Sequence, residues 1–82
     1  MDFEKLADTI LKGIGGEENI AGFTHCATRL RFTLKDESLA DEAGLKNTKG
    51  VLGIAKSGGQ FPIIIGNEVA KAYAAIQGKM TG

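Results

Sequence analysis

Residues 29–34 constrain the fold of this chain more than any other segment. Apolar and polar side chains alternate there without a break: Leu30, Phe32 and Leu34 alternate with Arg29, Arg31 and Thr33. Successive side chains of a β-strand point to opposite faces, so the segment predicts a strand with one buried face and one face toward water. Both arginines then project from the same polar face, about 7 Å apart. The fold is expected to be built on a sheet with one covered face.

Spacing also predicts the elements in the first half of the chain. Apolar residues recur every three or four positions after Asp2, which indicates a helix with Asp2 as its N-cap and Gly15-Gly16 just beyond its end. Residues 20–24 predict a strand that precedes the alternating one. Residues 41–47 predict a short helix that follows it.

Two more strands are expected in the second half of the chain. Residues 51–55 and 61–65 are joined by a glycine-containing connection of hairpin length, so we predict that they pair antiparallel. Pro62 has no backbone N–H, so its strand should either lie at a sheet edge or turn this position away from its neighbour. Gly66-Asn67 is expected to end that strand and cap a last helix, which continues to Gly78.

The predicted order is therefore α-β-β-α-β-β-α. Two hairpins linked by a helix indicate an α+β fold, with a four-stranded antiparallel sheet and about three helices packed on one face. A chain of 82 residues has room for one core. We assign residues 1–78 to a single domain and residues 79–82 to its C-terminal end or a linker stub.

Composition excludes several classes of function. Ten basic residues balance ten acidic ones, which disfavours a protein that binds the phosphate backbone of nucleic acid. Apolar runs such as Ile63-Ile64-Ile65 are far shorter than the roughly 20 residues that cross a bilayer, and the acidic N-terminus does not resemble a signal peptide. The single unpaired cysteine fits a reducing compartment, most simply the cytoplasm.

That cysteine lies in the segment Cys26-Ala27-Thr28-Arg29-Leu30-Arg31. A lone thiol forms no internal disulfide and cannot supply a zinc site, so no metal site is expected and any role must come from its reactivity. Guanidinium groups favour thiolate over thiol and present planar donors to phosphate oxygens. The pattern predicts a reactive Cys26 with Arg29 and Arg31 as partners for phosphate. A buried, inert thiol is the alternative.

Other cysteine chemistries fit the spacing less well. A phosphatase loop needs a longer separation than the one between Cys26 and Arg31. His25 and Cys26 are strand neighbours and point to opposite faces, so we predict that His25 borders the site as a structural or supporting residue, not as a base. The connection Ser57-Gly58-Gly59-Gln60 offers backbone amides to an anion if it lies beside Cys26, and is otherwise a hairpin loop.

Several of these segments together resemble a known family. They are residues 25–32, Lys35-Asp36, Gly50-Val51-Leu52-Gly53, Ser57-Gly58-Gly59-Gln60 and Ile65-Gly66-Asn67. In these residues the chain resembles the IIB domain of bacterial phosphotransferase-system sugar permeases of the glucose superfamily. The resemblance extends from Gly15-Gly16 through the last helix and is greatest for the β-glucoside branch, with sucrose and trehalose permeases as near relatives. Its C-x-T-R-L-R core is specific.

The resemblance implies a protein-cysteine phosphotransferase. In that family Cys26 would accept a phosphoryl group from the phosphohistidine of a IIA domain and pass it to a sugar, a β-glucoside or related disaccharide, held by a membrane-embedded IIC domain. Arg29 and Arg31 match the family's two arginines, which are associated with passing the phosphoryl group onward, and Thr28 adds a hydroxyl donor. The supporting residues around the phosphate are then Ala27, Thr28, His25, Gly58, Gly59 and Gln60.

The resemblance also implies a setting. No cofactor is expected, and a phosphorylated transcription regulator is a further candidate partner beside the IIA and IIC domains. The domain is expected in the cytoplasm, tethered to the inner face of the membrane through a fused or partner IIC domain. One alternative from another class stays open, a non-catalytic ligand-binding or regulatory α+β module with an inert thiol.

Overall fold

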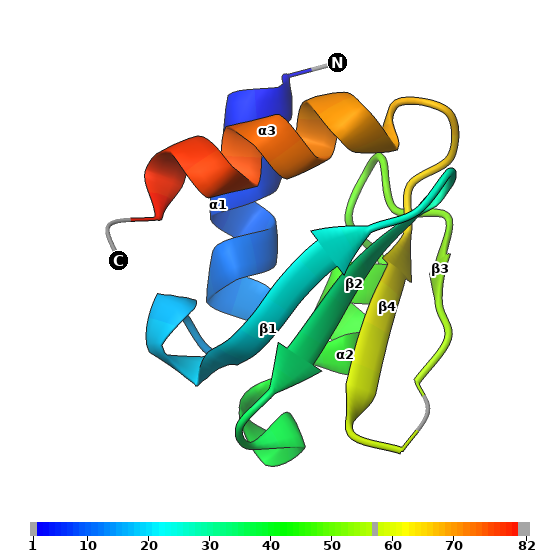
Figure 1. Ribbon diagram of the computed structural model, residues 1–82. Helices are drawn as coiled ribbons and strands as arrows, with labels where there is room; N and C mark the ends of the chain where they lie inside the picture. The colour runs from blue at the N-terminus through cyan, green and yellow to red at the C-terminus, as the bar shows by residue number, and fades with distance from the viewer. Residues whose placement is uncertain (1, 57, 81–82) are drawn as a thin grey trace.

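The computed structural model describes residues 2–56 and 58–80, and Figure 1 shows their arrangement. The helices are α1 (Phe3–Gly13), α2 (Glu42–Lys46) and α3 (Val69–Lys79). The strands are β1 (Ile20–His25), β2 (Arg29–Leu34), β3 (Gly53–Ile54) and β4 (Gln60–Ile64). Two single turns of 3-10 helix, Glu17–Asn19 and Glu37–Leu39, connect them. The predicted α+β order is confirmed.

The four strands form one antiparallel sheet in the order β1-β2-β4-β3. In Figure 1, α3 crosses in front of α1 near the upper end of the sheet, and α2 lies behind β4. Helix α3 packs against α1 and also contacts β1 and β2. One face of the sheet is therefore covered and the other is open, as the alternation in β2 predicts. Phe23 of β1, Phe32 of β2 and Phe61 of β4 lie in register across the covered face.

Alternation in β2 sets which side chains form the core. Leu30, Phe32 and Leu34 are buried, whereas Arg29 and Arg31 are exposed. The rest of the core comes from apolar residues of β4, the helices and the segments next to them, namely Leu6, Ala7, Ile10, Ile14, Leu45, Val51, Phe61, Ile63, Ile65, Val69, Ala72 and Ile76. Removing this apolar surface from water is the main driving force for folding.

Pro62 lies in a central strand, so of the two predicted alternatives the edge strand is wrong, and the direction of the missing N–H decides the other. The Ala55 N–H donates to the Pro62 carbonyl over 3.1 Å. In an antiparallel ladder the N–H and C=O of one residue point to the same neighbour, so the missing N–H of Pro62 faces β3 and not β2. Strand β3 is only Gly53–Ile54, shorter than the predicted residues 51–55, and its ladder ends beside the proline.

Helix ends agree with the sequence at α1 and differ at α3. The Asp2 side chain accepts from the Lys5 N–H, and Gly15-Gly16 has the positive φ expected beyond a helix end. Asn67 does not cap α3, however, because that helix begins two residues later with Glu68 at the N-cap position and no side-chain cap. Gly78 lies inside the helix, which continues to Lys79.

Asn19 joins α1, β1 and the segment after β2 through one buried side chain. It is 4% exposed, its amide nitrogen donates to the carbonyls of Ile14 (2.7 Å) and Asp36 (2.9 Å), and its oxygen accepts from the Asp36 N–H (2.9 Å). Asn19→Ala leaves these backbone groups without partners, and we expect a loss of about 2–3 kcal/mol in the free energy of unfolding. Urea denaturation measures it.

Asn47→Ala is the matched control, because Asn47 is an exposed residue at the end of α2. Its loss should stay within about 0.5 kcal/mol. Equal losses for the two variants would show that the buried amide network contributes little to stability.

Candidate functional site

Cys26 lies at the surface, in the turn between β1 and β2. The register pairs His25 with Leu30, so Cys26 faces Arg29 across a two-residue connection, Ala27-Thr28. The Cys26 N–H donates to the Arg29 carbonyl over 3.0 Å and closes this turn. The thiol is free and exposed.

The Cys26 thiol has a pKa below its ordinary value. The largest causes are hydrogen bonds from the backbone N–H of Thr28 and then of Arg29, and the charges of Arg31 and Arg29 contribute less. The sequence alone attributes such a shift to the guanidinium groups. The structure adds the larger cause, because the turn bends two amides toward the sulfur, whereas the arginine charges are screened by water.

Both arginines lie on the open face of the sheet. Arg31 of β2 is paired with Thr24 of β1 and with Pro62 of β4, and Arg29 is paired with Ile64 of β4. They are one strand step apart and both exposed, as the alternation predicts. Their guanidinium groups are therefore free to reach a phosphoryl group at the end of the turn.

The His25 side chain contacts the backbone of the turn that carries Cys26. Its ring lies 4.5 Å from the Tyr73 ring of α3, measured between centroids, and its Nδ1 is 3.0 Å from the Cys26 carbonyl oxygen. The ring thus points to the covered face, while Arg31 and Thr24 point to the open face. This is the arrangement expected of a supporting residue, not of a general base for Cys26.

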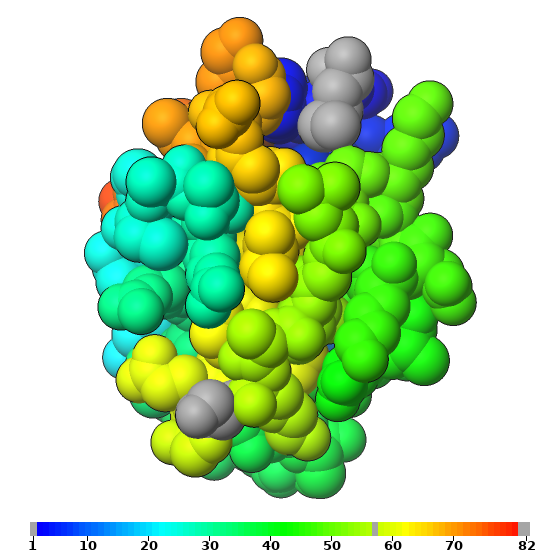
Figure 2. All heavy atoms as spheres, turned by 90° about the vertical axis from the view of Figure 1, so that its right-hand side faces the viewer, coloured from blue at the N-terminus to red at the C-terminus, as the bar shows by residue number. Residues whose placement is uncertain are grey.

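Gly58, Gly59 and Gln60 do not lie beside Cys26, so their predicted role around the phosphate is corrected. Gln60 is paired with Thr33, which lies four residues beyond Arg29 along β2. Gln60 is therefore roughly 14 Å from the Arg29 end of the strand, at the other end of the sheet. Figure 2 shows the β3–β4 connection at the bottom of the molecule and the start of α3 at the top. The glycines form a hairpin turn with positive φ, and Ser57 lies outside the described residues.

The connection between β4 and α3 lies beside Cys26 instead. The N–H groups of Ile65 and Gly66 both donate to the Thr28 carbonyl, each over 2.9 Å. Leu52, which is 73% exposed, is next to this connection, since a Cβ added to Gly66 would lie 3.4 Å from its Cδ1. Reasoning from the sequence missed these neighbours as site residues. The signal that could have found them is the Ile65-Gly66-Asn67 segment in the family resemblance.

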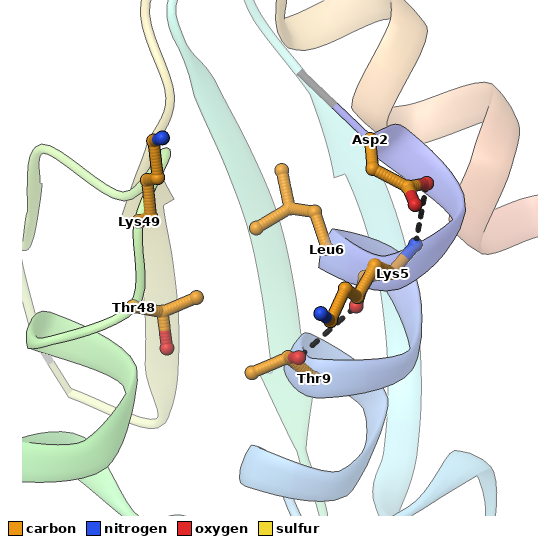
Figure 3. Close-up of a pocket in the computed structure, with 6 residues that line it drawn as sticks. All are labelled: Asp2, Lys5, Leu6, Thr9, Thr48 and Lys49. Carbon is orange, nitrogen blue, oxygen red and sulfur yellow. Dashed lines mark hydrogen bonds between the residues drawn. The ribbon is translucent and has the colours of Figure 1, made fainter.

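A surface hollow of about 370 Å³ lies elsewhere, between α1 and the connection from α2 to β3. Figure 3 shows the residues that line it: Asp2, Lys5, Leu6, Thr9, Thr48 and Lys49. It contains none of the predicted site residues. In the part of the chain that the structure describes, no cluster of three or more His, Cys, Asp or Glu side chains is arranged to hold a metal ion. Nor is any helix within it long and apolar enough to cross a membrane.

Alkylation of Cys26 by iodoacetamide tests the electrostatics of the turn. We expect the rate to reach half its maximum at a pH below the ordinary cysteine pKa of about 8.5, because the amides and arginines stabilise the thiolate. In urea the turn is lost and the midpoint should rise to the ordinary value. Mass spectrometry over a series of pH values measures both. A midpoint that does not change on unfolding would contradict the proposed stabilisation.

The lowered pKa also makes stability depend on pH. Between the folded-state pKa and the ordinary value the unfolded chain binds more protons at Cys26, so stability rises with pH across that interval. The contribution is complete above about pH 8.5 and is lost as pH falls through the folded-state pKa. Cys26→Ala should lack this slope in urea denaturation at matched pH values.

Comparisons with known proteins agree with this geometry. The family model described as "phosphotransferase system, EIIB" matches residues 8–41. The chain is 49% identical to a "PTS system beta-glucoside-specific EIIBCA component" of Dickeya chrysanthemi and 53% identical to one of Bacillus subtilis (strain 168), each over 76 residues that cover 93% of this chain and 12% of the relative. It is 46% identical to a "PTS system sucrose-specific EIIBC component" of Staphylococcus xylosus, over 100% of this chain and 17% of the relative.

A solved structure matches along most of its length. It is described as "The crystal structure of one domain of the PTS system, IIabc component from Clostridium difficile", and it superposes with a TM-score of 0.87 at 37% identity. The match covers 94% of this chain and 81% of that one. The curated relatives are much longer, since this chain spans only 12% to 17% of their length. Taken with the exposed cysteine turn and the four-stranded sheet, the match shows that the chain belongs to the EIIB family of the phosphotransferase system.

Proposed function

We propose that this chain is a protein-cysteine phosphotransferase that accepts a phosphoryl group on Cys26 from the phosphohistidine of a IIA domain and donates it to a sugar bound by a IIC domain. The observation that carries the proposal is the thiol itself. It is exposed at the end of the sheet, and two backbone amides together with two arginines lower its pKa. A thiolate at the surface can meet one partner after another.

The first step is nucleophilic attack by the Cys26 thiolate on the phosphorus of the phosphohistidine. A sulfur–phosphorus bond forms and the phosphorus–nitrogen bond breaks, and the bonding pair returns to the imidazole nitrogen of the donor. No base is proposed on this chain, because the lowered pKa of the Cys26 thiol raises the fraction of thiolate available for attack. This agrees with the position of the His25 ring against Tyr73.

The second step reverses the roles. A sugar hydroxyl oxygen attacks the phosphorus, the sulfur–phosphorus bond breaks, and Cys26 leaves as a thiolate, while the hydroxyl proton goes to a base of the acceptor domain or to water. The backbone N–H groups of Thr28 and Arg29 then stabilise the leaving sulfur. Transfer of this kind requires mainly alignment and neutralisation of charge on the phosphoryl oxygens.

Arg29 and Arg31 are proposed to neutralise those oxygens. They lie on the open face, one strand step apart, next to the turn that carries the sulfur. The Thr28 hydroxyl is exposed in the same turn and is proposed as a further donor, whereas Ala27 gives a small side chain that leaves the sulfur accessible. His25 supports the turn through its contact with the Cys26 carbonyl.

The partners follow from the composition of the relatives. Those named EIIBCA or EIIBC join such a domain to IIC, and in EIIBCA also to IIA, in one protein. We propose that this domain works in the cytoplasm, tethered to the membrane by a fused or partner IIC domain, with a transcription regulator as a further phosphorylated partner. The relatives named for β-glucosides and sucrose make a β-glucoside or related disaccharide the proposed sugar. Residues 1–78 are the proposed phosphocysteine domain and residues 79–82 its C-terminal end or linker stub.

Incubation with radiolabelled phosphoenolpyruvate, the general phosphotransferase proteins and a β-glucoside-type IIA domain tests the proposal. We expect one phosphoryl group per chain, located at Cys26 by mass spectrometry, and loss of the label when a matching IIC domain and its sugar are added. Prior alkylation of Cys26 should prevent labelling. A chain that stays unlabelled while the IIA domain is phosphorylated would favour the inert regulatory module instead.

A further inference from the structure

The turn that carries Cys26 is not a favoured hairpin turn. Two-residue hairpin connections usually adopt types I′ or II′, whose positive φ matches the twist of the strands. Ala27 and Thr28 both have negative φ, because no residue other than glycine has a positive φ in the described chain. The turn therefore needs contacts from outside the hairpin to keep its shape.

Those contacts come from the β4–α3 connection. In a continued ladder Thr28 would both accept from and donate to Ile65. Here the Thr28 carbonyl accepts from the N–H groups of Ile65 and Gly66, each over 2.9 Å, while the Thr28 N–H is directed at the Cys26 sulfur. Figure 1 shows the turn and the connection side by side at the upper right.

The geometry of one peptide unit links this contact to the nucleophile. The Thr28 carbonyl and the Arg29 N–H belong to the same planar trans peptide, so they point in opposite directions. Two donors that hold the carbonyl on one side therefore fix the Arg29 N–H on the other, where the Cys26 sulfur lies. Two hydrogen bonds to a single oxygen restrict the rotation of the peptide plane more than one would.

Gly66 makes the second donor available. Its φ of +100° is a conformation that residues with a side chain rarely adopt, and it sets the direction in which the chain leaves Gly66, so that the chain can turn toward α3 while the N–H groups of Ile65 and Gly66 both stay on the Thr28 oxygen. Space is not the reason for the glycine, because an added Cβ would meet only Leu52 Cδ1, at the ordinary distance of 3.4 Å. The position requires glycine for its backbone conformation.

We propose that Gly66 is a positioning residue for Cys26: its positive-φ backbone lets the chain turn toward α3 while the N–H groups of Ile65 and Gly66 stay on the Thr28 carbonyl, and so it holds the amides of the cysteine turn toward the sulfur. Only the effect of Gly66 on phosphoryl transfer rests on the proposed function. Its effect on the shape of the turn and on the Cys26 thiol applies to the free domain without any partner.

Gly66→Ala, with Gly16→Ala as the matched control, tests the proposal. Gly16 has a similar φ of +89° and an added Cβ there meets only ordinary contacts, so both variants place a side chain on a positive-φ residue without a clash. Gly16 precedes β1 at the end of the sheet remote from Cys26. We expect Gly66→Ala to move the pH midpoint of Cys26 alkylation up toward that of ordinary cysteine, and to slow phosphoryl acceptance roughly tenfold. Gly16→Ala should leave both unchanged.

A second variant of the protein removes the Gly66 N–H donor without changing any side chain. At 82 residues the protein is accessible to chemical synthesis, so the Ile65–Gly66 amide can be replaced by an ester, which has no N–H. The ester chain should show the same upward movement of the alkylation midpoint, and it decides the matter if Gly66→Ala does not fold. A folded ester chain with the midpoint of the parent protein, or an equal movement in Gly16→Ala, would overturn the proposal.

Failure of this proposal and failure of the proposed function give different results. The alkylation midpoint is measured on the domain alone and needs no phosphoryl donor. If the parent protein accepts phosphate and Gly66→Ala keeps its midpoint, only the role of Gly66 is overturned. If the parent protein accepts none, the function is overturned, while the midpoints still show whether Gly66 positions the turn.

Discussion

Replacing Cys26 with serine is expected to abolish phosphoryl acceptance. A serine hydroxyl placed in the same turn keeps nearly the same volume, but its pKa is too high for the amides of Thr28 and Arg29 to produce a useful fraction of alkoxide at neutral pH. Loss of a covalent nucleophile reduces the rate by several orders of magnitude, up to about 10⁶-fold in measured cases. Initial rates of label transfer from a phosphorylated IIA domain measure the effect.

Stability separates this result from simple unfolding. Cys26 is exposed, so Cys26→Ser should change the free energy of unfolding by no more than about 0.5 kcal/mol. Ala21→Ser is a suitable control, since it introduces the same side chain at an exposed position of β1 away from the turn and should keep the parent rate. Labelling of Cys26→Ser at the parent rate would place the phosphoryl group on another residue.

Phe32→Ala is expected to have the largest effect on stability. Phe32 is fully buried in the centre of the sheet, and its ring stacks on Phe23 of β1 with 4.6 Å between centroids. Truncation removes apolar contacts and leaves a cavity, at a cost of about 3–5 kcal/mol. Domains of this size have stabilities near the lower end of the usual range of about 5–15 kcal/mol, so most of the stability is lost. Urea denaturation with an unchanged m-value measures it.

Phe3→Ala provides the comparison for Phe32. Phe3 is partly buried at the start of α1 and packs against the edge of the core, so its truncation leaves an open depression and not a closed cavity. We expect less than half the loss of Phe32→Ala. Equal losses for the two variants would mean that the sheet is not the centre of the core.

The spacing of apolar residues, together with the positions of glycines and capping residues, was enough to predict the order of helices and strands and the two faces of the sheet. The alternation in residues 29–34 fixes which β2 side chains are buried, and Asp2 and Gly15-Gly16 mark the two ends of α1 by local chemistry. These features depend only on neighbours in the chain. They are therefore readable without knowledge of the tertiary structure.

The order of the strands in the sheet could not be predicted from neighbouring residues in the chain. Pairing β2 with β4 is a contact between residues about 30 positions apart, and other orders would bury the same apolar faces. For this reason Pro62 was expected at an edge as one alternative, although it lies in a central strand. The same missing information left open whether Gly58, Gly59 and Gln60 lie beside Cys26 or only form a hairpin loop, and the register with Thr33 places them at the other end of the sheet.

The sequence shows which residues adjoin the cysteine, but not the main physical cause of its lowered pKa. The sequence shows directly that arginines lie near the cysteine, but it does not show the direction of a backbone N–H. The contribution of the Thr28 and Arg29 amides to the thiol pKa is therefore seen only in the three-dimensional structure. The same holds for the contact between Thr28 and the distant residues Ile65 and Gly66.

The two outer strands of the sheet have a consequence for behaviour at high concentration. Strand β3 offers a second copy only two residues to pair with, and β1 has an irregular register between Ile20 and Gly22. Long, regular outer strands recruit further strands and lead to aggregation, and short or bulged ones do not. A domain with an exposed thiol can in this way reach a high local concentration without joining its own copies into fibrils.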